Sequence, residues 1–157
     1  MKITYRGYLY ESVDNKLYYH GSMDELPVGT ILSPKDNYEE NWGDNNFYQI
    51  LEKYRPSNML AHMESVFMCD NPDDIDAAGG GTDYLFTVVP MGKVERHDMN
   101  WGSYIESMIS DGVLKDDPKI INAANMYWKG VPVDSSIGET LWEYLTPHAK
   151  ILAVEEY

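Results

Sequence analysis

Two kinds of apolar periodicity follow one another along this chain, and their order limits the folds open to it. Runs rich in Tyr, Ile, Leu and Val predict strands at residues 3–11, 16–20, 65–69 and 83–90. Apolar residues at helical spacing predict helices at 46–54, 101–110 and 118–128, and two strands at 141–145 and 149–155 close the chain. Because strands, helices and strands follow in separate blocks, the order predicts an α+β domain.

Shorter signals fill the intervals between these segments. Asp14-Asn15 predicts a hairpin turn between the first two strands. The long loop at 23–45 contains a short strand at 30–32, and Pro72 at a first turn predicts a brief helix over 72–78. With 157 residues and 43% hydrophobic composition, the chain is expected to form one domain, 1–157.

The balance of charge excludes some partners. Asp and Glu total 26 against 12 Lys and Arg, so the formal net charge is -14. Nucleic acid and anionic membranes are therefore unfavourable partners, because phosphate contacts need clustered cations, whereas a basic protein fits. The lone Cys69 forms no intramolecular disulfide and is expected to be a buried, inert thiol. Neither a signal peptide nor a membrane span is visible, which predicts a soluble, cytoplasmic protein.

Several known kinds of site do not fit. His62-Met63-Glu64 has the His-x-Glu spacing of a zinc deaminase, but the paired cysteines are absent. Asp74 and Asp76 imitate the start of a calcium loop whose later ligand positions are apolar. We therefore expect no metal site, and we expect His97 and His148 to lie on the surface.

Three separated segments carry the remaining chemistry, and each ends or lies on a predicted strand. They are His20-Gly21-Ser22, the run Ser65-Val66-Phe67-Met68-Cys69-Asp70-Asn71-Pro72, and Leu141-Trp142-Glu143-Tyr144-Leu145-Thr146-Pro147. Glycine lets a ligand approach bare backbone, and the imidazole of a neighbouring histidine can hold a hydroxyl. In the third segment a glutamate precedes a proline by four positions and is followed by another strand.

In this order the three segments resemble the ADP-ribosyltransferase superfamily, in its diphtheria-toxin-like and poly(ADP-ribose)-polymerase-like branch. The resemblance implies a split β-sheet with peripheral helices and NAD as co-substrate. It implies that His20 holds a ribose hydroxyl and that the Gly21 backbone grips the nicotinamide amide. It further implies that Phe67 stacks on the nicotinamide ring and that Glu143 is the catalytic carboxylate.

Other residues receive weaker roles from the same resemblance. Ser22 and Ser65 would add polar contacts, and Tyr38 would lie over the adenosine. Arg55 fits either the pyrophosphate or an ion pair with a surface carboxylate. The loop at 129–138 precedes the Glu143 strand, where family members read their acceptor, so Trp128 and residues 131–137 are candidates for that contact.

The chain also departs from the family. Phe67 lacks the phenol of the usual Tyr, and Leu141 stands where arginine-modifying members have a second Glu. Leu141 therefore argues against an arginine acceptor. The further acceptor-site features of the polymerase branch are not found in the sequence, so single transfer, to an acceptor of protein nature, is favoured over polymer growth. Two alternatives stay open, an NAD glycohydrolase on the same fold and a catalytically silent acidic domain that binds a partner. RNA 2′-phosphotransfer is disfavoured by the shortage of basic residues. Small acidic chains resembling this family are often encoded by bacteriophages, which would place the activity in the host cytoplasm.

Overall fold

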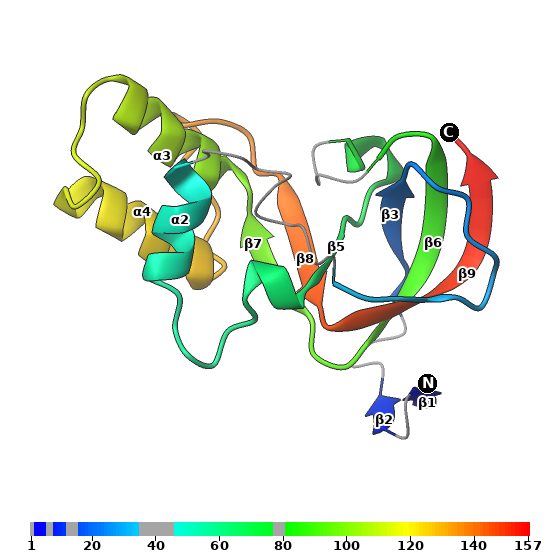
Figure 1. The fold of residues 1–157 in the computed structure, drawn as a ribbon. Coiled ribbons are helices and arrows are strands. Elements are labelled where there is room, and N and C mark those ends of the chain that lie inside the picture. The colour runs from blue at the N-terminus through cyan, green and yellow to red at the C-terminus, as the bar shows by residue number, and fades with distance from the viewer. Residues whose placement is uncertain (1, 6–7, 12–15, 35–45, 77–80) are drawn as a thin grey trace.

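The computed structural model describes residues 2–5, 8–11, 16–34, 46–76 and 81–157, with the backbone alone at 2–5, 8–11 and 46 (Figure 1). Strands precede, interrupt and follow a block of helices, so the predicted α+β class is confirmed. The elements in chain order are β1 (Lys2–Tyr5), β2 (Tyr8–Glu11), β3 (Tyr18–Ser22), β4 (Ile31–Leu32), α2 (Asn46–Lys53), the 3₁₀ helix η1 (His62–Glu64), β5 (Val66–Met68), the 3₁₀ helix η2 (Pro72–Asp74), β6 (Tyr84–Met91), β7 (Glu95–Asp98), α3 (Asn100–Ser110), α4 (Pro118–Trp128), β8 (Trp142–Thr146) and β9 (His148–Glu156).

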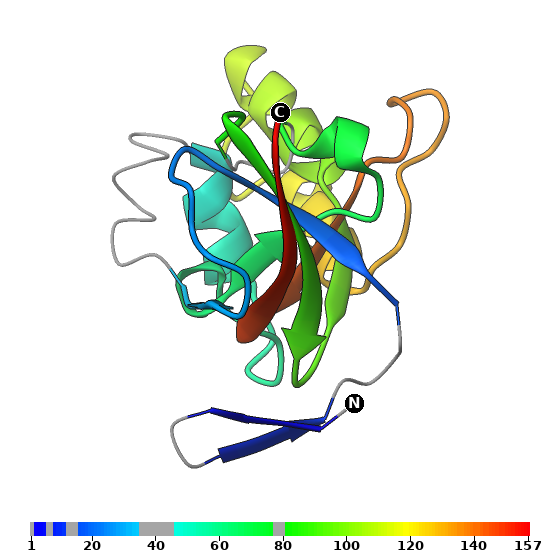
Figure 2. The same ribbon diagram turned by 90° about the vertical axis from the view of Figure 1, so that its right-hand side faces the viewer.

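The N-terminal strands form a hairpin of their own. β1 and β2 pair with each other in antiparallel fashion, with Ile3 opposite Tyr10, and Figures 1 and 2 show the hairpin projecting from the rest of the molecule. The prediction of one strand over 3–11 is therefore wrong, because the two halves of that segment pair together. The predicted hairpin with 16–20 is wrong as well, since β3 pairs with β6. Its expected turn at Asp14-Asn15 lies outside the described residues.

Two larger antiparallel sheets make up the body. One has the strand order β3-β6-β9-β4 and the other the order β5-β8-β7. They meet where Tyr19 and Cys69 exchange backbone hydrogen bonds of 2.9 and 3.0 Å. This is the one bridge between β3 and β5 in the described residues, so the two sheets adjoin at a seam instead of continuing as one ladder.

The helices gather beside the β5-β8-β7 sheet (Figure 1). Asp117 caps α4 by accepting a hydrogen bond from the Lys119 N–H, and Pro118 occupies its first turn, where no backbone donor is needed. The helices then bury apolar faces on one another, which stabilises elements too short to persist alone. The buried members of this cluster are Ile50, Leu51, Trp101, Ile105, Met108, Ile120, Ala123, Ala124, Tyr127, Trp128 and Val133.

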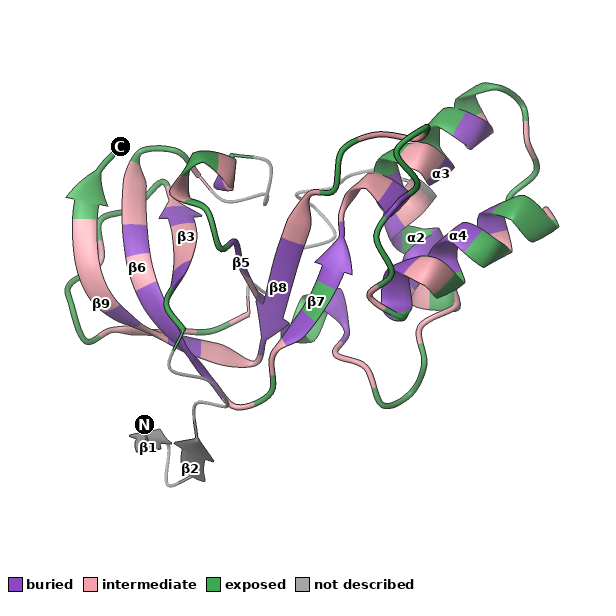
Figure 3. Cartoon of the chain, turned by 180° about the vertical axis from the view of Figure 1, so that it is seen from behind, coloured by how far each residue is buried: buried purple, intermediate pink, exposed green. Residues whose placement is uncertain are grey.

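Strand β7 was not predicted, because its sequence, Glu95-Arg96-His97-Asp98, is entirely polar or charged. Figure 3 nevertheless shows most of this strand as buried. The expectation that His97 lies on the surface is wrong: it is 0% exposed, since its ring packs under α4 and its Nδ1 donates to the Tyr127 carbonyl over 2.7 Å. His148 is half-buried on β9.

Asp98 is the last residue of β7, and its carboxylate binds backbone N–H groups of the segments that follow. Its Oδ1 accepts from the N–H groups of Asn100 and Leu141, each over 3.0 Å, and its Oδ2 accepts from Val133 over 2.9 Å. These bonds fasten the start of α3 and the loop before β8 to the sheet. The carboxylate is 0% exposed, so the three donors compensate for the cost of burying its charge.

Among the residues that the structure describes, no helix has the length and apolar character needed to cross a lipid bilayer.

Candidate functional site

The three motif strands are consecutive neighbours in space. β3 carries His20, Gly21 and Ser22; β5, which follows it across the seam, carries Phe67; and β8, which pairs with β5, carries Glu143. The segments lie far apart in the sequence, so only the topology brings them together. The seam between β3 and β5 is therefore the candidate site.

The backbone of Gly21 faces the seam. The N–H and C=O of Tyr19 point toward β5, where both bond Cys69. Peptide groups of alternate residues in an antiparallel strand point the same way, so those of Gly21 also point toward β5. No bridge between the described parts of the two strands continues to Gly21. Its donor and acceptor consequently lie on the side of β3 that faces β5, beyond the Tyr19–Cys69 bridge.

The His20 side chain connects β3 to β5 beside that bridge. Its Nδ1 lies 2.7 Å from the carbonyl oxygen of Phe67, and because a carbonyl only accepts, Nδ1 carries the proton. In the neutral ring Nε2 is then the acceptor atom, which suits it to a ribose hydroxyl. The ring also stacks on Phe86 of β6, with centroids 6.2 Å apart and planes inclined by 19°.

Phe67 and Glu143 share one face of the β5-β8 ladder. Phe67 pairs with Leu145, and side chains of paired residues lie on the same face. Glu143 stands two residues before Leu145 on β8, so it lies on that face too. An aromatic ring and a carboxylate are thus diagonal neighbours beside the seam.

The Glu143 carboxyl is largely withdrawn from water. The residue is 6% exposed, and its Oε1 accepts a hydrogen bond of 2.6 Å from the hydroxyl of Tyr127 on α4. Burial raises the pKa of Glu143, although the Tyr127 hydrogen bond and the nearby His97 partly counter that rise. A carboxyl whose pKa moves upward toward the working pH is better matched to proton transfer than an ordinary surface glutamate.

Tyr127 is a site residue that the sequence did not reveal. Its spacing with Ile120, Ala123 and Ala124 placed it on the apolar face of a helix, and it is 2% exposed. A buried tyrosine hydroxyl needs a polar partner, and that requirement is the signal that could have pointed to a carboxyl nearby.

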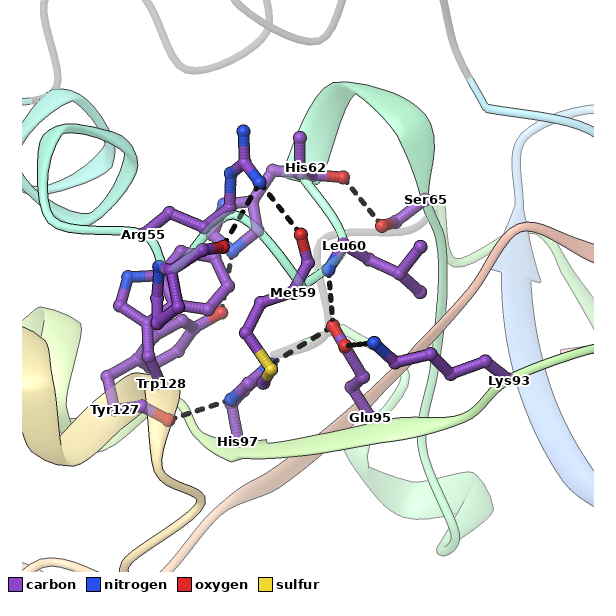
Figure 4. Close-up of polar contacts among 12 residues, drawn as sticks. Arg55, Met59, Leu60, His62, Ser65, Lys93, Glu95, His97, Tyr127 and Trp128 are labelled. Carbon is purple, nitrogen blue, oxygen red and sulfur yellow. Dashed lines mark hydrogen bonds and ion pairs between the residues drawn. The ribbon is translucent and has the colours of Figure 1, made fainter.

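His62 is a second residue that the sequence does not assign to this site, because its motif resembles only that of a zinc deaminase. Its Nε2 lies 2.6 Å from the Tyr127 hydroxyl, a contact drawn in Figure 4. Rings surround it at centroid distances of 5.4 Å for Trp128, 5.5 Å for Phe67 and 5.8 Å for Tyr48. Burial is the main reason that the pKa of His62 falls to about 3, so its imidazole is neutral under ordinary conditions.

The remaining predicted site residues make structural contacts. Ser22 closes a turn, donating to the Asp24 carbonyl over 2.8 Å, and Ser65 donates to the Ala61 carbonyl over 2.7 Å. Arg55 pairs with Glu52 over 2.8 Å, as one of its two interpretations required. Tyr38 lies outside the described residues.

Gly21 also has a packing role. A Cβ placed on it would lie 2.2 Å from the carbonyl oxygen of Gly81 and 3.3 Å from Cβ of Ile75. Bare backbone at this point is therefore needed to seat the chain around Gly81, whether or not a ligand binds. The glycine satisfies two requirements at once, and the packing requirement is the one shown directly.

The loop before β8 is firmly attached. Trp101 donates its indole N–H to the Val131 carbonyl over 2.6 Å, and Val133 is buried. Trp128, predicted as an acceptor contact, is 3% exposed and donates to the Leu51 carbonyl over 2.7 Å. It belongs to the helical core, whereas every residue of 131–137 except Val133 is exposed or half-buried.

No protein-family model matches this chain, and a search of curated proteins found no match either.

Proposed function

We propose that this protein is an NAD-dependent mono-ADP-ribosyltransferase of the His-aromatic-Glu type, with a protein as acceptor. The observation that carries the proposal is the direct succession of β3, β5 and β8 around a seam into which the Gly21 peptide groups point. A histidine, an aromatic ring and a carboxylate predicted from three distant motifs lie on three adjacent strands. The split between the two sheets accords with the fold that the resemblance implies.

Each group has a task in this reaction. The Gly21 N–H and C=O hold the carboxamide of nicotinamide, and the Phe67 ring packs on its face. Nε2 of His20 accepts a hydrogen bond from a ribose hydroxyl, while the bond from Nδ1 to the Phe67 carbonyl keeps the ring in place. These contacts orient the nicotinamide–ribose bond beside the Glu143 face of β8.

Glu143 supplies the negative charge. When nicotinamide departs with the bonding electrons, positive charge develops on the ribose ring, as in glycoside hydrolysis. A carboxylate with little water around it stabilises that charge more strongly than a solvated one. The same group accepts the proton of the acceptor nucleophile as the new bond to ribose forms.

The decisive experiment uses NAD labelled on its ADP-ribose portion. Wild-type protein, Glu143→Gln and a control, Glu155→Gln, are incubated with the label and a bacterial lysate; Glu155 lies exposed on β9. We expect protein labelling by wild type and control, and none by Glu143→Gln, which still binds NAD in calorimetry.

Three other results are informative. Release of nicotinamide and free ADP-ribose without labelling selects the glycohydrolase. If the wild-type protein neither cleaves nor binds NAD, the proposal is overturned, and the acidic binding domain remains as the alternative. Full labelling by Glu143→Gln removes Glu143 from the chemistry.

A further inference from the structure

We propose that Tyr127 is a positioning residue for Glu143 and that His62 keeps the Tyr127 hydroxyl pointed at the carboxylate, so that Oε1 is held and Oε2 acts on the substrate. This inference rests on the proposed function and adds to it two residues outside the three motifs. It begins from two consecutive contacts of 2.6 Å, between His62 Nε2 and the Tyr127 oxygen and between that oxygen and Glu143 Oε1.

The direction of the hydrogen bonds follows from proton counting. A tyrosine hydroxyl has one proton, and an ionised carboxylate can only accept. If Tyr127 donates to Glu143, its oxygen must accept from His62, whose Nε2 then carries the ring proton. The neutral state of His62, whose pKa is about 3, supplies that single donor without adding a positive charge. The chain therefore runs from His62 to Tyr127 to Glu143.

The surroundings keep Tyr127 from turning away. His97 of β7 stacks under its ring, with centroids 4.4 Å apart and planes inclined by 21°, and donates to its backbone carbonyl. The Trp128 ring stands edge-on at 4.9 Å. Rotating the phenol would break this stacking, so the hydroxyl points at β8 by packing as well as by hydrogen bonding.

A buried carboxylate on β7 fixes the segment that presents His62. Oε1 of Glu95 accepts from the Leu60 N–H over 2.7 Å, and its Oε2 pairs with Lys93 over 2.6 Å (Figure 4). Burial alone would raise the pKa of Glu95, but hydrogen bonds from His97, Lys93 and the Leu60 backbone outweigh it and lower the pKa. The lowered pKa favours the ionised form of Glu95, which lies at the base of the network.

This arrangement gives the two carboxyl oxygens of Glu143 different tasks. Oε1 keeps its bond to Tyr127 whether Glu143 is ionised or protonated, because a carboxyl retains an acceptor oxygen in both states. No bond to Oε2 is found within the described part of the chain, and this atom is left for the ribose hydroxyl or the acceptor proton. Losing Tyr127 frees the carboxylate to rotate and removes a donor that stabilises its charge.

Charged and titratable groups approach Glu143 from each neighbouring element. Tyr127 comes from α4, and His97 comes from β7 with Glu95 behind it. His62 comes from η1, and its own pKa is lowered by the charge of Arg55, which follows α2. A titration of Glu143 must therefore be compared among variants that leave β7 unchanged.

The test measures the Glu143 carboxyl directly, without NAD. Protein labelled at glutamate carboxyl carbons is titrated by NMR, and Glu143→Gln identifies the signal by its disappearance. Tyr127→Phe keeps the ring and removes the hydroxyl, so the Glu143 pKa is expected to rise further. Tyr104→Phe, on α3, is the matched control and should leave that pKa unchanged. His62→Leu should shift it in the same direction as Tyr127→Phe, and His62→Gln, which retains a donor, should restore it.

Kinetics with NAD provide the second measurement. Losing a hydrogen bond to a charged group should reduce kcat of Tyr127→Phe about ten- to a hundredfold while KM for NAD stays within about twofold. The acid limb of its pH profile should move upward with the Glu143 pKa. An unchanged Glu143 titration in Tyr127→Phe overturns the positioning role. A shifted titration in a protein whose wild type leaves NAD intact supports the coupling and overturns only the proposed function.

Discussion

The imidazole of His20 donates to the Phe67 carbonyl across 2.7 Å, between strands that exchange one pair of backbone hydrogen bonds among the residues that the structure describes. The side chain stands where a continuous sheet would place a further ladder contact. The His20 side chain therefore links the two strands at a point where no bridge between their described backbones is found.

His20→Ala should weaken NAD binding. One hydrogen bond to ribose is lost, which corresponds to about 1–2 kcal/mol, or roughly five- to thirtyfold in Kd. Isothermal calorimetry measures the change, with His148→Ala on β9 as the comparison. Equal affinities for wild type and His20→Ala would show that NAD does not touch this ring.

Gly21→Ala should destabilise the fold before any effect on NAD is considered. The added Cβ would meet the Gly81 carbonyl oxygen at 2.2 Å, so backbone must shift. We expect a loss of about 1–3 kcal/mol in the free energy of unfolding, measured with denaturant. Gly138→Ala is the control, since its nearest neighbour would be an Asn100 side-chain atom at an ordinary 3.7 Å. A Gly21→Ala protein as stable as the control would contradict this packing.

Glu143→Gln should stabilise the protein at neutral pH. Burial raises the folded-state pKa of Glu143, so the contribution of this group is greatest at low pH and is lost as pH rises through that value. Glutamine keeps an acceptor for Tyr127 and has no charge to bury. The thermal midpoint of the variant should therefore exceed that of wild type at neutral pH, and the difference should shrink below the ordinary glutamate pKa of about 4.3. A variant less stable than wild type at neutral pH contradicts the sign.

His62 should make the protein sensitive to mild acid. Its folded pKa of about 3 lies below the unfolded value of 6.5, so the stability that it confers is complete above the unfolded value and declines as pH falls toward the folded one. The expected loss is about 2 kcal/mol near pH ~5, measured as the shift in denaturant midpoint from neutral pH. His62→Gln should flatten this dependence, whereas His148→Gln should leave it. An equally steep loss in His62→Gln would place the acid sensitivity elsewhere.

The apolar elements were predictable, and the polar ones were not. Helices α3 and α4 and strands β6, β8 and β9 came from the sequence within a residue or two, because their burial depends on apolar periodicity. Strand β7 could not be predicted, because Glu95, His97 and Asp98 are buried by hydrogen bonds to groups far along the chain. Polar residues of this kind have no periodic signature, since their partners are fixed only when the fold is complete.

The residues of the candidate site also divide into those that the sequence predicts and those that it does not. The order of the motifs singles out Phe67 and Glu143 as candidates, and the fold places their strands side by side. Tyr127 and His62 could not be predicted, because the first had the spacing of a core residue and the second lies outside any strand. The contact of Tyr127 with Glu143, and that of His62 with Tyr127, depend on α4 and η1 packing against one sheet face, which no local pattern encodes.

The only cysteine of the sequence stands at the junction of the two sheets, and this gives the protein a built-in chemical reporter. Cys69 is 0% exposed, its Sγ lies 3.1 Å from the Asn71 carbonyl oxygen, and burial raises the pKa of its thiol to about 12. Since alkylating reagents react with the thiolate, the native protein should be modified very slowly. Modification requires an opening that exposes Cys69 and allows its thiol to ionise, so the alkylation rate, with and without NAD, reports how readily the seam opens.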